Sequence, residues 1–448
     1  MTNPPVVTRR VRARRKALQL PFTREHIRPV SHPDLRAFRE QAWEVYEAIP
    51  MPTLQDEPWR RTDIRGLPAD TLRLPEATGD LQVAQVPDVL QASPLGEALA
   101  GQLVLSLEAP VLHTLDDALA RRGVIFTDLR TAEQAHPDLL ARLVGQVVKP
   151  QEGKFAALGH ALARNGALVY IPQGVQLEKA LHILFWGPGE GLAYFDHLIV
   201  WLEPGAKATL VVEWASPDES AEALHVGVVE VHVAEDADLT WVELQSWGTH
   251  MWNFTHERAR VGRNARLNWI LGAVGSKLTK SFMDIDLVAP GAEGYMSGFY
   301  FADDHQHLDH DTQQNHLAPH TTSDLLFKGA VKDTARSVWQ GLIYVAPGAQ
   351  GTDGYQANRN LVLNPGARAD SIPGLEIMAN EVRCTHGATV SRIDEEQIFY
   401  MRTRGVPRKV AERLLIEGFF AEILDRIPFE TIRERFRMGI ARKMGYTT

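Results

Sequence analysis

Cysteine is almost absent from this sequence, in which Cys384 is the only one among 448 residues. A single cysteine excludes an intramolecular disulfide framework and any zinc module built from several cysteines. It also fits a reducing compartment, so we expect a cytoplasmic protein.

Long apolar runs and excess positive charge are absent as well. No apolar stretch approaches the length of a membrane span, and no signal-peptide core is present. The formal net charge of −9 argues against nucleic acid as a partner. The start of the chain is the exception, because residues 9–16 are strongly basic. We expect residues 1–30 to form a solvated, disordered arm.

The common enzyme signatures are missing too. Gly153-Lys154 is followed by Phe155, so the chain has no phosphate-binding P-loop. The Gly294–Gly298 stretch has the wrong spacing for a nucleophile elbow. An independent enzyme is therefore disfavoured.

The residues present predict three parts. From Ser31, apolar residues recur at helical spacing, and residues 31–165 are expected to form a helical or mixed N-terminal domain. From 166 to 392, short β runs alternate with turn signals. Helical spacing then returns over 393–448, where the apolar face could cap the end of the β region or meet a partner.

Small-residue corners punctuate the β region. They end in Ala206, Ala237, Ala265, Ala292, Ala349 and Ala367, at intervals of 31, 28, 27, 57 and 18 residues. A repeated strand–corner unit is typical of a β-solenoid, since one unit cannot bury its apolar face alone. We therefore predict a mainly β protein with a β-solenoid (β-helix) core.

Cys384 and His386 stand at the end of this region. Residues two apart on a strand share a face, so a thiolate and an imidazole would converge there as soft and borderline metal ligands. The neighbouring Arg383 is expected to lower the pKa of the thiol. Asp394 is expected to cap the helix that follows.

A histidine cluster is the rival site. His305, His307 and His310 lie close together, followed by His316 and His320, with aspartates between them. Histidines and carboxylates on a β scaffold can bind iron or manganese, as in cupins. A cupin-like metal enzyme is one alternative function, although an exposed loop or interface would have the same composition.

The stretch LEIMANEVRCTHGATVSRIDEEQIFYMRTRG resembles the C-terminal signature of the SufB/SufD family of iron–sulfur cluster assembly scaffolds. The pattern SxxxxKGxxxDxxRSVxxG from Ser323 to Gly341 and the stretch RGVPRKVAERLLIEGFFAEIL after residue 403 also resemble that family. The segment DEPWRRTD, residues 56–63, favours the SufD branch over the SufB branch.

The resemblance implies a non-catalytic scaffold with a β-helix core, which pairs with SufB and binds the SufC ATPase. It places His386, beside Cys384, at a cluster-assembly site shared with SufB. One thiolate and one imidazole are too few for a stable cluster, so we expect only a transient nascent cluster and none in the isolated chain. The implied SufC-docking residues are Pro407, Val410, Leu414, Leu415, Phe419, Phe420 and Ile423.

A purely structural β-solenoid adaptor is the second alternative function. Exchange of Cys384 and His386 without functional loss would favour it. The isolated chain could also form a homodimer.

Overall fold

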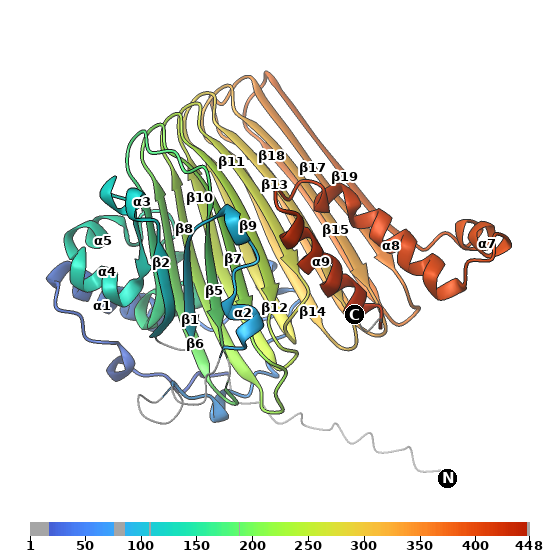
Figure 1. Cartoon of the computed structure of the whole chain (residues 1–448), viewed down its shortest axis with the longest axis horizontal. Coiled ribbons are helices and arrows are strands. Elements are labelled where there is room, and N and C mark those ends of the chain that lie inside the picture. Colours follow the sequence, from blue (N-terminus) through green and yellow to red (C-terminus); the bar gives the residue numbers. More distant parts are fainter. Residues whose placement is uncertain (1–17, 76–85, 107–108, 188, 446–448) are drawn as a thin grey trace, which may run out of the picture.

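A computed structural model describes residues 18–75, 86–106, 109–187 and 189–445 (Figure 1). Its core is a β-solenoid in which successive strands alternate between two sheets, as the corner spacing predicts. The ten-stranded sheet has the order β19-β17-β15-β13-β11-β9-β7-β5-β1-β2. The nine-stranded sheet has the order β18-β16-β14-β12-β10-β8-β6-β4-β3. Within both sheets the pairing is parallel, except between β1 and β2 and between β3 and β4.

The strands are β1 (Leu99–Ser106), β2 (Ala109–Leu115), β3 (Ile125–Asp128), β4 (Asn165–Ile171), β5 (Ala180–Trp186), β6 (Ala193–Leu202), β7 (Lys207–Ala215), β8 (Ala223–Val233), β9 (Asp238–Ser246), β10 (Met251–Val261), β11 (Arg266–Ala273), β12 (Leu278–Leu287), β13 (Glu293–Ala302), β14 (His307–His316), β15 (Thr322–Val331), β16 (Arg336–Val345), β17 (Thr352–Val362), β18 (Arg368–Ile377) and β19 (Val382–Arg392). Strands β1, β2 and β3 extend the two sheets at the end where β4 and β5 lie, so the sheets include residues before 166, where the sequence placed the start of the β-helix core.

The corners between the nine-stranded and the ten-stranded sheet are stacked. Each corner amide donates to a carbonyl one turn further on, in the pairs Gly205–Glu235, Asp236–Arg263, Asn264–Pro290, Gly291–His320, His320–Gln350 and Gly351–Glu381. Asp236 and Asn264 have positive φ values of 57° and 52°, a conformation that Asp and Asn tolerate better than most residues.

This stack explains the irregular corner spacing in the sequence. The corner missing from the 57-residue interval lies at His320, whose φ is also 57°. The corner at Ala367 belongs to the opposite edge, where β17 passes to β18, and this accounts for the interval of 18.

The N-terminal helices cover the outer face of the nine-stranded sheet (Figure 1). This layer is formed by α1 (Pro33–Ala48), α4 (Leu129–Ala135), α5 (Pro137–Leu143) and α6 (Lys154–Leu162). The short helix α2 (Asp88–Gln91) packs instead beside β1 and β5 of the ten-stranded sheet, and α3 (Asp117–Arg121) connects β2 to β3. Leu20, Phe22 and Val30 are buried in this layer. The predicted disordered arm therefore does not include residues 18–30, and its remainder lies outside the described residues.

The DEPWRRTD segment packs on the same outer face. Trp59 contacts the ring of Phe155, with centroids 5.6 Å apart. Thr62 is buried; its hydroxyl donates to Asp309 and lies 2.8 Å from Nε2 of His307. This segment and the histidine-rich strand β14, which the sequence left as separate motifs, therefore form one contact.

Replacing Thr62 tests this contact. Asp309 also forms an ion pair with the buried Lys280 at 3.0 Å. The Thr62 hydroxyl therefore donates to a carboxylate that is fully buried and lies in an ion pair. We expect Thr62→Val to lower the free energy of unfolding by about 1.5–3 kcal/mol, the usual loss for a hydrogen bond to a charge. Urea denaturation measures this change. The matched control is Thr53→Val, because the exposed Thr53 hydroxyl also donates to an aspartate, Asp56, and its loss should change stability by less than about 0.5 kcal/mol. If Thr62→Val lowers the free energy of unfolding no more than Thr53→Val does, the hydrogen bond between Thr62 and Asp309 does not stabilise the fold.

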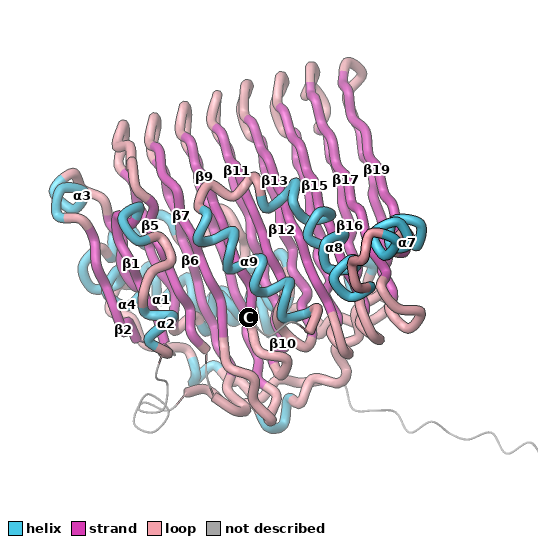
Figure 2. The backbone as a smooth tube through the Cα atoms, turned by 45° about the vertical axis from the view of Figure 1, so that its right-hand side comes forward, coloured by secondary structure: helices cyan, strands magenta, loops and turns pink. Residues whose placement is uncertain are grey.

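The C-terminal helices are α7 (Glu395–Thr403), α8 (Arg408–Leu424) and α9 (Glu430–Lys443). Helices α8 and α9 lie across the outer face of the ten-stranded sheet (Figure 2). Buried side chains such as Phe420 and Phe436 pack there against Phe299 and Ile270. These helices therefore form a fourth layer of the molecule and do not cap the end of the solenoid.

Candidate functional site

Cys384 and His386 lie on β19, the terminal strand of the ten-stranded sheet. In register, Cys384 is beside Gly354 and His386 is beside Gln356 of β17. Gln356 is fully buried between the sheets, so the predicted pair shares the inward face of β19. His386 is exposed and Cys384 is half-buried, because no further strand of the described chain covers this end of the sheet.

Cys384 packs against the apolar cluster of Ile343, Val345 and Ala349, and it also approaches the buried His316 across Gly354. A Cβ at Gly354 would lie 3.3 Å from both Sγ of Cys384 and Nε2 of His316, so glycine lets the thiol and the imidazole approach the same point. His316 is fully buried and is held by Thr321 and Ser323 at 2.8 Å each. The thiol of Cys384 and the imidazole of His386 thus lie near the surface, above a layer of buried polar side chains.

The expected effect of Arg383 on the thiol is wrong. Its side chain projects to the other face of β19 and pairs with Asp353. Burial raises the pKa of Cys384, the amide of Gly354 acts to lower it, and the charge of Asp353 adds a smaller upward effect. We therefore expect Cys384 to be a weakly reactive thiol in the isolated chain.

Alkylation of Cys384 provides a direct test. Because its pKa is raised, we expect iodoacetamide to react more slowly with the folded chain at pH 7.5 than with the urea-unfolded chain. The rate should rise about tenfold per pH unit and level off only above the ordinary thiol pKa of about 8.5. Intact mass spectrometry can follow the reaction, since the chain has one cysteine.

Two variants give the sign of the charge effect. Asp353→Asn should lower the pKa of Cys384 and speed the reaction, whereas Arg383→Ala should expose the charge of Asp353 and slow it. If the pKa of Cys384 in the folded chain is instead below about 8.5, the prediction that Arg383 lowers the pKa of this thiol would be supported after all.

The solenoid interior below this site is polar, which sequence reasoning missed. Asn358 and Asn360 of β17 are fully buried and bond to each other and to the hydroxyl of Tyr300, at 2.6–3.3 Å. Tyr355, on the outer face of the same strand, is 37% exposed. Alternating polar residues on a strand usually face solvent, whereas on β17 the polar residues face the interior. Nothing in the sequence of β17 itself indicates which of its two faces is buried.

The three histidines of the rival metal site do not converge. His305 lies in an exposed corner, where it contacts Thr334. His307 is on the outer face of β14, at Thr62, whereas His310 faces inward and stacks on Tyr300. Strand alternation separates His307 from His310, so these residues form no common metal site.

The residues expected to dock SufC divide between two faces of α8. Phe420 and Ile423 are fully buried against the sheet, and Val410, Leu415 and Phe419 are partly buried. Leu414 is 44% exposed, and Pro407 is also exposed, as the residue that caps α8. On α7, capped by Asp394 as predicted, Phe399 and Tyr400 are 68% and 61% exposed, a feature that sequence reasoning did not single out.

The end of the solenoid that carries Cys384 presents apolar side chains to the surface. Leu375, Ile377 and Met378 on or after β18, and Val390 on β19, are between 38% and 57% exposed. Strands β18 and β19 terminate the two sheets. Terminal strands of this length with apolar side chains are typical of surfaces that pair with another chain.

Two protein-family models match this chain. The model for the SUF system FeS cluster assembly SufBD core domain matches residues 185–419, more than half of the chain. The SufBD protein N-terminal region matches residues 21–183. The chain belongs to the SufBD family.

SufBD proteins of staphylococci are among its relatives. An iron–sulfur cluster assembly SufBD family protein of Staphylococcus aureus strain USA300 is 28% identical over 328 residues, covering 73% of this chain and 70% of the relative. Proteins of the same description from Staphylococcus epidermidis and Staphylococcus saprophyticus are each 29% identical over the same length. In the described part of the chain, every helix is too short or too polar to cross a membrane.

Proposed function

We propose that this SufBD family protein is a SufD-type scaffold subunit, without catalysis of its own, that works with SufB and the SufC ATPase in the cytoplasm. The observation that carries the proposal is the position of Cys384 and His386. Both face inward at the solenoid end whose terminal strands expose apolar residues. A second solenoid that paired with β18 and β19 would enclose these two ligands together with its own.

A cluster held between β18, β19 and the second solenoid would take its ligands from both chains. Cys384 supplies one thiolate when deprotonated and His386 one imidazole, whereas an iron–sulfur cluster usually needs about four protein ligands. The nascent cluster is therefore the cargo of the assembled complex and is held only transiently. His386 is the more accessible of the two, so we assign it the larger role.

SufC would bind at the C-terminal helices. The exposed Phe399 and Tyr400 of α7 and Leu414 of α8 supply an apolar surface for it. Phe420 and Ile423, which the sequence grouped with Leu414, instead hold α8 on the sheet. ATP hydrolysis in SufC would then act on a helix layer that is continuous with the solenoid.

Co-purification with SufB and SufC tests the proposal. Charge at the terminal strands should block pairing, so we expect Leu375→Lys combined with Val390→Lys to abolish SufB binding and to retain SufC. Val111→Lys is the matched control, because Val111 of β2 is 48% exposed, at the opposite end of the solenoid, and Val390 is 49% exposed. If the double variant still binds SufB, pairing of SufB with β18 and β19 is refuted. A wild-type chain that binds neither protein would refute the scaffold role.

The isolated chain offers a second measurement. The same terminal strands should allow a homodimer, which the Lys variants should convert to monomer in sedimentation experiments. A dimer that persists in the double variant would place the self-association elsewhere.

A further inference from the structure

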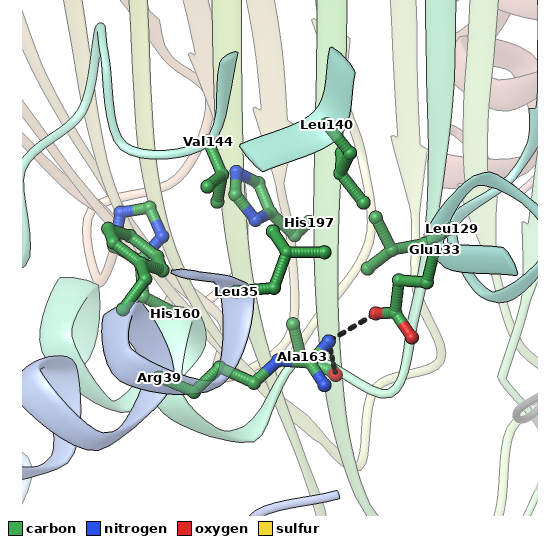
Figure 3. A pocket seen from close by; sticks show the side chains of 10 residues that line it. Leu35, Arg39, Leu129, Glu133, Leu140, Val144, His160, Ala163 and His197 are labelled. Carbon is green, nitrogen blue, oxygen red and sulfur yellow. Dashed lines mark hydrogen bonds and ion pairs between the residues drawn. The ribbon is translucent and has the colours of Figure 1, made fainter. Parts of the chain in front are cut away.

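A second group of ligand-type side chains lies in a different layer from Cys384, where the N-terminal helices meet the nine-stranded sheet. It consists of His160 on α6, His197 on β6 and Glu230 on β8, all at most 2% exposed. One potential ligand atom from each residue lies within 4.8 Å of the other two. His160 and His197 line a small cavity of about 20 Å³, with the ion pair of Arg39 and Glu133 on its other side (Figure 3).

Glu230 is an ionised anchor in this group. Its Oε1 accepts from the amide of Gly145 at 2.7 Å and from Nε2 of His197 at 2.8 Å. Its Oε2 accepts from the amides of Val147 and Val148 at 2.6 and 3.1 Å. Burial acts to raise the pKa of Glu230, but these donors, chiefly His197, lower it overall. A negative charge is thus held in a buried position.

His160 has one imidazole nitrogen without a hydrogen-bond partner in the described part of the chain. Its Nε2 donates to the carbonyl of Val148 at 3.1 Å, which fixes the tautomer and leaves Nδ1 without a proton. That Nδ1 is fully buried and has no hydrogen-bond partner among the described residues. An imidazole that donates one nitrogen to a backbone carbonyl and keeps the other free is arranged as metal-bound histidines usually are.

We propose that His160, His197 and Glu230 bind one divalent late transition-metal ion, with Zn²⁺ as the best match to two imidazoles and one carboxylate. A neutral His197 would bind the ion through Nε2 after its proton moves to Nδ1, so the imidazole would stay neutral and no proton would be released. Bonds of about 2.0–2.2 Å require the ligand atoms to draw slightly closer. The cavity beside them has room for about one water molecule as a fourth ligand.

The surroundings make this a structural site. The rest of the cavity wall is mainly apolar, with Leu35, Phe38, Leu129, Leu140, Val144 and Ala163. A substrate could not reach an ion there. The ion would instead join α6 to β6 and β8, and so fix the N-terminal helices on the solenoid. This inference does not depend on the proposed SufD-type function.

Metal binding by the untagged full chain tests the proposal. After treatment with a chelator, titration with Zn²⁺ should give one tightly bound ion per chain and raise the melting temperature by several degrees. X-ray absorption of the bound ion should show nitrogen and oxygen ligands with imidazole and no sulfur. Sulfur scattering would place the ion at Cys384, and absence of a stoichiometric ion would leave only a trapped water; either result overturns the proposal.

Variants identify the ligands. His160→Gln should weaken Zn²⁺ binding more than about 100-fold, beyond the 10–100-fold that outer partners contribute. His182→Gln is the matched control, because His182 is equally buried, bonds to Glu213 at 3.0 Å and also has an unpartnered Nδ1, but belongs to no three-residue group in the described chain. Undiminished binding in a folded His160→Gln chain would overturn the assignment. If that variant does not fold, the absorption spectrum of the wild type decides.

Discussion

Phe436→Ala is expected to lower the free energy of unfolding by about 3–5 kcal/mol, the usual loss for a buried phenylalanine. The Phe436 side chain of α9 is 1% exposed and rests on Gly272 of β11, where a Cβ would come within 1.9 Å of its ring. Its ring also packs edge-on against Phe299, with centroids 5.2 Å apart. Truncation would leave a cavity under α9 that the rigid sheet cannot close.

Urea denaturation followed by tryptophan fluorescence measures this loss. Met438→Ala is the control, since Met438 lies on the same helix and is 37% exposed, and it should change stability by less than about 0.5 kcal/mol. Gly272→Val should destabilise the same contact from the other side by overpacking, by about 1–3 kcal/mol. Similar midpoints for Phe436→Ala and the wild type would show that α9 is not needed for the stability of the sheet.

His386→Ala is expected to reduce cluster assembly in cells by at least about tenfold, since even outer partners of a metal contribute roughly 10–100-fold to its affinity. The side chain is exposed on a terminal strand, so its loss should change stability by less than about 0.5 kcal/mol. Complexes with SufB and SufC should still form, and their ATPase activity should be unchanged. The effect is therefore separable from folding and from assembly.

Thr385→Ala is the matched control, because Thr385 is also exposed on β19 but points to the opposite face. Cys384→Ser should have a milder effect than His386→Ala if the thiol is auxiliary, since a hydroxyl keeps the shape but binds soft metals poorly. A His386→Ala complex with full activity in cells would remove His386 from the site. The scaffold role would then rest on the pairing experiment alone.

The sequence predicted the features that local chemistry specifies. Gly, Asn and Asp at the corners supply positive φ, so the repeat and the solenoid were visible before the structure. The corner at His320 was missed because the sequence there, Ala318-Pro319-His320-Thr321, lacks the small residue and alanine that end the other corners. Strand alternation likewise placed Cys384 and His386 on one face without any knowledge of the fold.

Features that depend on which sheet or helix layer packs against a given face were not predictable from the sequence. The helical pattern of α8 showed one broad apolar face, but not whether a sheet or a partner covers it, so Phe420 and Leu414 were grouped together. The buried Asn358 and Asn360 reverse the usual rule for strand faces. His160, His197 and Glu230 are separated by 33 or more residues and come from three elements, so only the packed structure brings them together.

The regular register of the two sheets has a consequence for how such a chain can change in length. His307 of β14 pairs with Arg336 of β16, and Leu278 of β12 pairs with His307, an offset of 29 residues each time. Insertion of one residue within β14 would exchange the environments of His310 and Asp311, moving an ionisable group from one sheet face to the other along the rest of the strand. Insertion or removal of a complete turn would preserve every side-chain orientation. Viable length variants of this protein should therefore differ by whole turns, or by residues confined to the corners.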